Sequence, residues 1–298
     1  MSARILDGKG LSNTIREEIA EEVAELKEKH GLTPGLAVII VGDNPASEIY
    51  VRNKGRACEK CGIYSETIPM PADVSQDELI RKVEELNVNP RIHGVLVQLP
   101  LPGHINENAV INSISPEKDV DGFHPVNVGR LVIGKEKPLL PCTPSGIQAL
   151  LLRNGVETSG KHTVIIGRSN IVGKPLTLLL MQKTEGGNCT VTVCHSRTRN
   201  IEEVIRTGDI IIAAIGRANF VTKDMVKPGA VVIDVGINRV EDSSKKKGYR
   251  LEGDVDFEEV KEVAEAITPV PGGVGPMTIA MLLRNTVTAA KRLNEIKA

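Results

Sequence analysis

The sequence predicts an α/β protein of two α/β domains, the second built on a Rossmann-type parallel sheet. Short β-branched runs alternate with helical patterns along the 298 residues, and such alternation is typical of parallel sheets with right-handed crossovers. In addition, residues 161–175 read as a strand, a glycine turn and a helix, the order found in dinucleotide-binding units. A chain of this length is long enough for two ordinary domains.

The first half is organised around a strand and the helix that follows it. Leu36–Val41 is an apolar, β-branched run, and a helical pattern after it stops at Cys61-Gly62. Tyr50 and Lys54 are four residues apart on this helix, so their side chains face the same way. This face should lie near the carboxyl edge of the sheet, where open α/β sheets bind ligands. An exposed lysine beside a half-buried tyrosine would fit the spacing equally well.

Composition excludes several classes of protein. The 37 basic and 38 acidic side chains give a net charge of -1, which argues against nucleic acid or an anionic membrane as the main partner. We expect neither a signal peptide nor a membrane span. The five cysteines form no paired framework, and Cys58 and Cys61 lack the partners of a zinc site, so we expect no metal. This usage fits a reducing cytoplasm.

Two helices of the first half carry recognisable start signals. Ser12 or Asn13 can cap a helix ending at Gly31, whose apolar stripe consists of Ile15, Ile19, Val23 and Leu26. Ser75 and Glu78 form a capping box, and the inward positions of the helix that it opens are Leu79, Ile80, Val83 and Leu86.

A second buried strand ends in a polar residue. Gly94–Val97 is apolar enough to be buried on both faces, and Gln98 follows it. A buried glutamine needs partners for its donor and its acceptor. Backbone groups could supply them, or Gln98 could share a crevice with Lys54. Further along, 118–122 is an acidic loop, and Thr143 with Pro144 predicts the start of a helix over 143–155.

The second half continues with strand and helix units. Predicted strands follow the glycine turn within 189–194, 209–216 and 230–236. The first of them ends in His195-Ser-Arg-Thr198, without the carboxylate that usually binds the ribose of NAD. With Arg168 in the glycine turn, Arg197 instead suits the 2′-phosphate of NADP, although a solvated turn residue is the alternative.

The last segments are a hairpin, a loop and a helix. Lys245–Lys247 should form a charged hairpin tip between two short extended pieces. A rigid loop over 268–277 contains Gly272 and Gly273, which let the backbone approach a ligand. It leads into a helix over about 276–296, whose inner face consists of Ala280, Leu283 and Val287.

The chain resembles the methylenetetrahydrofolate dehydrogenase/cyclohydrolase family over nearly its whole length. Five motifs carry the resemblance: Tyr50-Val-x-x-Lys54, Val97-Gln-Leu-Pro-Leu-Pro102, Lys118-Asp-Val-Asp-Gly122, Gly167-Arg-Ser-x-Ile-Val-Gly173 and Pro269-Val-Pro-Gly-Gly-Val-Gly-Pro276. Arg56, where many relatives carry Lys, and an insertion around Lys245 depart from the family pattern.

The resemblance implies a fold and an activity. A folate-binding catalytic domain over 1–145, completed by the C-terminal helix 276–298, and a Rossmann NADP-binding domain over 146–275 should flank a cleft. The subunits should form a homodimer. The enzyme should oxidise 5,10-methylenetetrahydrofolate to the methenyl form with NADP, then hydrolyse it to 10-formyltetrahydrofolate. A lysine can serve the second step if its surroundings lower its pKa from about 10.4.

Residue roles also follow from the resemblance. Tyr50 should stack on the folate aminobenzoyl ring, Lys54 should be the acid–base residue tuned by Gln98, and Asp121 should bind the pterin. The other folate contacts are Leu99, Pro271, Gly272 and Gly273. The cofactor contacts are Gly167, Arg168, Ser169, Gly173, Ser196, Arg197 and Ile237.

Other functions remain open on the residues alone. A Rossmann dehydrogenase of a hydroxy acid would explain the second half, but not Tyr50, Lys54 and Gln98 together. A non-catalytic folate- or nucleotide-binding protein would keep the fold but would tolerate loss of Lys54. A fused formate–tetrahydrofolate ligase is not expected, since no phosphate loop for it is present.

Overall fold

The computed structural model describes residues 2–134, 138–245 and 248–296. The chain divides into two compact units. The three-stranded unit comprises residues 13–142 and 279–298, and the six-stranded unit comprises residues 1–12 and 143–278. Helices α1 (Gly8–His30) and α10 (Val274–Leu293) contain residues of both. The expected class of two α/β domains, one with a Rossmann-type parallel sheet, is confirmed.

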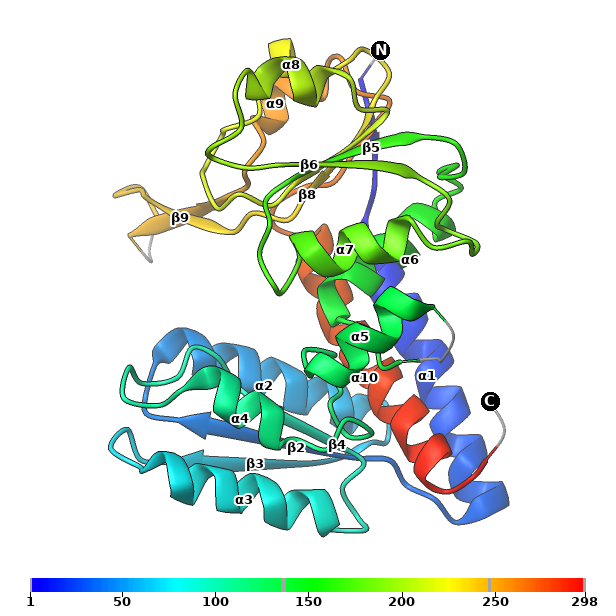
Figure 1. The fold of residues 1–298 in the computed structure, drawn as a ribbon, viewed down its shortest axis with the longest axis vertical. Helices are drawn as coiled ribbons and strands as arrows, with labels where there is room; N and C mark the ends of the chain where they lie inside the picture. The colour runs from blue at the N-terminus through cyan, green and yellow to red at the C-terminus, as the bar shows by residue number, and fades with distance from the viewer. Residues whose placement is uncertain (1, 135–137, 246–247, 297–298) are drawn as a thin grey trace. The chain divides into compact units, whose positions relative to one another are not determined.

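The three-stranded unit has a parallel sheet in the order β3-β2-β4. Its strands are β2 (Gly35–Val41), β3 (Tyr64–Met70) and β4 (Gly94–Val97). Its further helices are α2 (Pro45–Lys60), α3 (Gln76–Val88), α4 (Glu107–Ser113) and α5 (Pro125–Ile133). Figure 1 shows α3 running along the sheet.

Aliphatic side chains fill the core of this unit, since the whole chain has only three Phe, three Tyr and no Trp. Every residue of β2 is buried, because helices cover both faces of the strand. One core cluster joins alternate residues of β2 and β4 to α3 and α4: Ala37, Ile39, Val41, Val95, Val97, Leu79, Val83 and Val110. Successive side chains along a strand point to opposite faces of the sheet. The alternate residues in this cluster therefore lie on one face.

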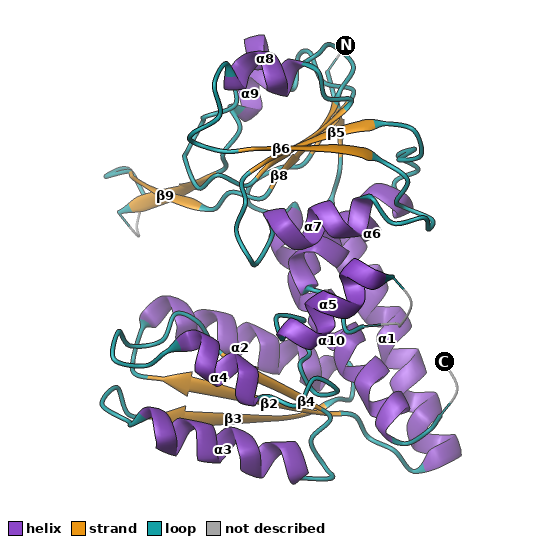
Figure 2. Ribbon diagram, viewed as in Figure 1, coloured by secondary structure: helices purple, strands orange, loops and turns teal. Residues whose placement is uncertain are grey.

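The six-stranded unit has an all-parallel sheet in the order β1-β11-β8-β7-β5-β6. The strands are β1 (Arg4–Ile5), β5 (His162–Ile166), β6 (Thr190–Cys194), β7 (Ile210–Ala213), β8 (Val231–Asp234) and β11 (Ala266–Ile267). The helices are α6 (Cys142–Arg153), α7 (Gly173–Leu180), α8 (Ile201–Arg206), the 3-10 turn Lys223–Met225 and α9 (Phe257–Val260). Figure 2 shows these helices around the strands.

An antiparallel hairpin of β9 (Asn238–Glu241) and β10 (Tyr249–Glu252) projects from this unit, as predicted. Of its predicted basic tip, Lys246 and Lys247 lie outside the described residues. Within the residues that the structure describes, no helix has the length and apolarity that a membrane crossing requires.

Two helix starts differ from the sequence prediction. Helix α1 begins at Gly8, four residues before Ser12, because the Asp7 carboxylate accepts the Gly10 N–H at 3.0 Å. Ser12 is instead buried, and its hydroxyl donates to the Pro276 carbonyl at 3.0 Å. Helix α6 begins one residue before Thr143, whose hydroxyl pairs with that of Thr278 at 3.0 Å. The apolar stripe of α1 and the Ser75 cap of α3 are confirmed.

The first strand was also not predicted. Arg4 and Ile5 pair with Ala266 and Ile267 of β11, so residues 1–12 lie with the six-stranded unit. The helix α10 residues from Ile279 onward lie with residues 13–142. The expected inner face of α10 is buried.

Candidate active site

Lys54 and Gln98 meet at the carboxyl edge of the three-stranded sheet. Strand β4 runs parallel to β2, and the Gln98 backbone N–H donates to the Ile39 carbonyl at 2.9 Å. The Lys54 ammonium nitrogen Nζ donates to Gln98 Oε1 at 3.1 Å. At the other end of the amide, Gln98 Nε2 donates to the Leu99 carbonyl at 2.7 Å. The two predicted alternatives for Gln98 therefore occur together: a backbone carbonyl accepts from its amide N–H, and Lys54 donates to its amide oxygen.

Tyr50 lies one helical turn before Lys54 on α2. Its side chain is 47% exposed, whereas Lys54 is half-buried. An exposed aromatic ring beside a partly buried amine offers a flat apolar surface to a planar ligand. The predicted common face of Tyr50 and Lys54 is thus open to solvent at its tyrosine end.

The acidic loop over 118–122 contains two carboxylates with different surroundings. Asp119 is buried and accepts the N–H groups of Phe123 and His124 at 3.2 and 2.8 Å, and the Asn127 amide at 2.9 Å. Its oxygens therefore hold the start of α5. Asp121 is only partly buried, and among the described residues its carboxylate has no backbone N–H donor of this kind.

The electrostatics of Asp121 connect it to Lys54. Burial raises the pKa of Asp121, the charge of Lys54 opposes that rise, and the neighbouring Asp119 adds to it. The structure thus brings Lys54, Gln98 and Asp121 together from α2, the end of β4 and the acidic loop. A carboxyl group, an amine and an amide in this arrangement can bind polar edges of a ligand and transfer protons.

Lys118, in the same loop, has a structural environment. Its buried ammonium donates to the carbonyls of Leu86 and Asn89 at 3.1 and 2.9 Å, at the end of α3. Such contacts satisfy the last carbonyls of a helix. Burial lowers the pKa of Lys118.

In the six-stranded unit, a glycine turn joins β5 to α7. Gly167 has a φ of 132°, and a Cβ there would lie 2.2 Å from the Ala214 carbonyl oxygen. A Cβ on Gly173 would lie 2.2 Å from the carbonyl oxygen of Gly167. Only glycine therefore allows the N-terminus of α7 to approach the end of β5. The Ser169 hydroxyl accepts the Val172 and Gly173 N–H groups at 3.1 and 3.4 Å.

Two neighbouring turns expose the predicted cofactor contacts. The Gly167 N–H donates to the Cys194 carbonyl at 2.8 Å, so the turns after β5 and β6 are adjacent. Arg168, Ser169, Ser196 and Arg197 are all exposed there. The His195 N–H donates to the Thr198 hydroxyl at 2.9 Å, which fixes the second turn. Two guanidinium groups and two hydroxyls suit an anionic, phosphate-bearing cofactor.

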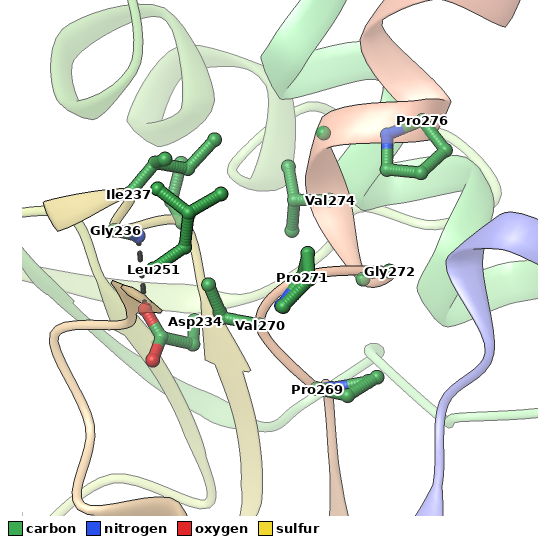
Figure 3. A pocket seen from close by; sticks show the side chains of 13 residues that line it. Asp234, Gly236, Ile237, Leu251, Pro269, Val270, Pro271, Gly272, Val274 and Pro276 are labelled. Atoms are coloured by element: carbon green, nitrogen blue, oxygen red, sulfur yellow. Dashed lines mark hydrogen bonds between the residues drawn. The ribbon is translucent and has the colours of Figure 1, made fainter. Parts of the chain in front are cut away.

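A pocket of about 130 Å³ lies at the end of β8. Figure 3 shows Ile237 and Leu251 on one side of it, with Val274 and Pro271 on the other. The loop residues predicted to contact folate, Pro271, Gly272 and Gly273, line this pocket together with Ile237, a predicted cofactor contact. Leu251 on β10 also lines it and was not predicted, because nothing in its local sequence points to a ligand.

Two carboxylates support the loops around this pocket. Asp234 accepts the N–H groups of Gly236, Asp254 and Val255, each at 2.9 Å. Asp254 accepts those of Ile215 and Gly216 at 2.7 and 2.8 Å. Burial raises the pKa of Asp234 to about 6. Within the described chain, no three His, Cys, Asp or Glu side chains converge as a metal site.

Comparison with known proteins identifies relatives over both units. Residues 6–121 match the family described as tetrahydrofolate dehydrogenase/cyclohydrolase, catalytic domain, and residues 141–294 match the NAD(P)-binding domain of the same name. A relative called bifunctional protein FolD from Prosthecochloris aestuarii is 59% identical over 293 residues, 98% of this chain and 99% of the relative. One of the same name from Brevibacillus brevis is 58% identical over 292 residues, again 98% and 99%.

Solved structures of the same family have the same fold. The methylenetetrahydrofolate dehydrogenase/cyclohydrolase FolD of Campylobacter jejuni has a TM-score of 0.92 at 50% identity, covering 98% of this chain and 100% of that one. The Trypanosoma brucei enzyme of this kind, solved with NADP cofactor and an inhibitor, has a TM-score of 0.93 at 44% identity and covers 100% of both chains.

Proposed function

The chain belongs to the tetrahydrofolate dehydrogenase/cyclohydrolase family, and from this premise we propose that Lys54 is the acid–base residue of its hydrolytic step. The enzyme oxidises 5,10-methylenetetrahydrofolate to the 5,10-methenyl form with NADP and hydrolyses that product to 10-formyltetrahydrofolate. The observation that carries the role of Lys54 is its 3.1 Å hydrogen bond to Gln98, together with its electrostatic effect on Asp121.

The hydrolysis requires a group that both takes and returns a proton. Water adds to the methenyl carbon and gives up one proton. The resulting alcohol then loses its hydroxyl proton as the bond from carbon to N5 breaks and N5 is protonated, so one proton is released overall. As the proposed base, Lys54 Nζ takes the first proton and delivers one to N5, and the hydroxyl proton is the one released. Gln98 Oε1 orients the amine, because the opposite end of its amide is fixed on Leu99.

The folate-binding roles follow from exposure and charge. Tyr50 presents its exposed ring to the aminobenzoyl group, and Leu99 adds a partly buried apolar contact. Unlike Asp119, the Asp121 carboxylate has no backbone donor among the described residues, and it accepts from the N–H groups of the pterin. The apolar pocket of Ile237, Pro271, Gly272 and Gly273 receives a planar ring of a bound ligand.

The turns after β5 and β6 would hold NADP, which would supply the hydride acceptor for oxidation of the one-carbon bridge. The close approach at Gly167 and Gly173 leaves backbone without side chains next to the cofactor, and Ser169 and Ser196 supply hydroxyls. The exposed guanidinium groups of Arg168 and Arg197 bind its phosphates. Hydride transfer itself needs alignment of the reactants rather than an acid or base from the protein.

The assembly and location are part of the same proposal. The enzyme is a cytoplasmic homodimer. Strand β6 is the last in its sheet, and Val193 on it is 37% exposed, so the edge offers unpaired backbone groups and apolar side chains to a second copy. Light scattering at micromolar concentration should then give twice the 32.1 kDa chain mass. A fully active monomer would contradict the dimer.

Replacement of Lys54 by Met tests the catalytic role. The variant keeps the length of the side chain but lacks the titrating group, so cyclohydrolase turnover should fall roughly 10²–10⁴-fold. Dehydrogenase turnover should persist, with methenyl absorbance accumulating. Lys60→Met, which removes an exposed charge from the same helix, serves as the control and should leave both activities intact. Near wild-type hydrolysis by the Lys54→Met enzyme would refute this role of Lys54.

A further inference from the structure

We infer that Asn285 on α10 is a positioning residue for Asp121, acting through the backbone of the turn that carries it. This role of Asn285 depends on the proposed role of Asp121 in binding folate. The Asn285 side-chain nitrogen Nδ2 donates to the Val120 carbonyl at 2.8 Å and to the Leu140 carbonyl at 2.8 Å. These contacts lie inside the three-stranded unit, and Asn285 is 9% exposed.

The two carbonyls belong to separate segments of the chain. Val120 directly precedes Asp121 in the acidic loop, and Leu140 lies in the stretch leading to α6. An amide nitrogen carries two hydrogens, and Asn285 uses one for each segment. A single buried side chain thus ties the two segments together, and buried carbonyls without a donor are costly. No side chain of another type has this fixed pair of donors at the same length.

Cys142 reinforces the same connection. Its thiol donates to the Val120 carbonyl at 3.2 Å and lies 3.7 Å from Asn285 Nδ2. Hydrogen bonding to Cys142 lowers the pKa of Asp121, against the larger effect of burial. Burial raises the pKa of Cys142 well above the usual thiol value. The thiol is therefore a fixed neutral group against the turn.

The residue after Asp121 leaves the turn little freedom. Gly122 has a φ of +74°, and a Cβ there would lie 2.4 Å from the Pro141 backbone nitrogen. Asp121 is thus placed between a clamped carbonyl at Val120 and a glycine packed against Pro141. Without Asn285, the Val120 carbonyl keeps only the weaker thiol donor of Cys142, so its peptide plane can rotate, and this rotation moves the Cα of Asp121 and the carboxylate that it carries.

Substitution of Asn285 by Leu removes both donors while keeping a similar volume. We expect the Michaelis constant for folate to rise roughly tenfold in both reactions, equivalent to the net loss of about one hydrogen bond. The Michaelis constant for NADP and the turnover number at saturating folate should change less. The matched control is Thr286→Val: Thr286 is also buried on α10, but its hydroxyl donates within the helix, to the Leu282 carbonyl at 2.8 Å. Thr286→Val should leave the folate constant unchanged.

The double variant with Asp121→Asn separates positioning from general loosening of the structure. If Asn285 acts through Asp121, Asn285→Leu should raise the folate constant little further in the Asp121→Asn enzyme. Full additivity of the two effects, or an unchanged folate constant in Asn285→Leu, would overturn the role of Asn285 alone. An unchanged Michaelis constant for folate in the Asp121→Asn enzyme would overturn the folate-binding role of Asp121. The positioning role of Asn285, which depends on it, would then also be overturned. If Asn285→Leu does not fold, Asn285→Ser, which keeps one shorter donor, replaces it, alone and combined with Asp121→Asn.

Discussion

Asp121 in the three-stranded unit and Asp234 in the six-stranded unit both have a pKa raised by burial, yet they are held in opposite ways. Asp234 accepts three backbone N–H groups at 2.9 Å, so its oxygens connect neighbouring loops. Asp121 interacts with the charge of Lys54 and the thiol of Cys142. A raised pKa alone therefore does not identify a ligand-binding acid. The hydrogen bonds that the protein already makes to the carboxylate distinguish the structural role of Asp234 from the proposed folate-binding role of Asp121.

Basic side chains show the same contrast between groups that the protein itself binds and groups that are exposed. Lys118 is buried and donates to two carbonyls at the end of α3, whereas Arg168 is exposed in the glycine turn. Lys54 lies between these cases, with one hydrogen bond to a side-chain amide. Replacing a charged group whose hydrogen bonds are all made within the protein should change the stability of the fold. Replacing a group that is open to a ligand should change ligand binding.

Asp234→Asn tests the saturated carboxylate, through the pH dependence of unfolding. The folded pKa of about 6 is above the ordinary value of 3.8, so the folded state holds a proton that the unfolded state releases between these values. Wild-type stability from this group should therefore be largest below about pH 4 and should fall by roughly 3 kcal/mol as the pH rises past 6. The Asn variant lacks this decline.

Urea unfolding of both proteins at pH 4.5, 6 and 8 measures the difference. The stability of the variant relative to wild type should improve as the pH rises. A pH-independent difference would contradict the buried, titrating state of Asp234.

Asp121→Asn tests the available carboxylate. The variant keeps the shape but loses the charge, so the folate Michaelis constants of both reactions should rise in parallel by roughly 10- to 150-fold, as for a charge-assisted hydrogen bond of 1.5–3 kcal/mol. An effect confined to one reaction would give Asp121 a catalytic part instead.

Arg168→Ala extends the comparison to an exposed cation. Loss of a charge-assisted contact to the 2′-phosphate should raise the Michaelis constant for NADP by roughly tenfold, near the lower end of the range for such contacts because the side chain is exposed. The constant for NAD should hardly change. Arg199→Ala, an exposed arginine after the neighbouring strand, is the matched control. Equal effects of Arg168→Ala on both cofactors would exclude the 2′-phosphate role.

Local patterns predicted the elements on which the site is built. The β-branched run of β2 and the Ser75 cap of α3 each depend on residues that are near neighbours in the sequence, and both are confirmed. The meeting of Lys54 and Gln98 was predictable because parallel strands end at one edge of a sheet. The two-residue strands β1 and β11 are too short to show a period, and they were missed.

Long-range polar contacts could not be predicted from the sequence. Asn285 and Val120 are 165 residues apart, and no spacing rule connects an asparagine in a helix to a distant backbone carbonyl. The partners of Asp234 are backbone N–H groups, which every non-proline residue carries, so its sequence context does not distinguish it from Asp121. Only the folded chain shows which acid is saturated.

His93 gives the smallest expected effect, with a sign opposite to that of Asp234. Its ring nitrogen Nδ1 accepts the Gly35 N–H at 3.0 Å, so the folded state requires the neutral ring. Burial, then the charge of Lys118, lowers the pKa of His93 below its usual value. Stability from this group is therefore fully present above about pH 6.5 and declines as the pH falls below it, by at most about 1.4 kcal/mol per pH unit. His93→Asn keeps an acceptor for Gly35 without titrating, so in urea unfolding between pH 5 and 8 wild type should lose stability relative to this variant only on the acid side. The exposed His30→Asn is the control and should show a smaller change. If wild type and His93→Asn change in parallel across this range, His93 does not titrate in the buried, neutral state required by its bond to Gly35.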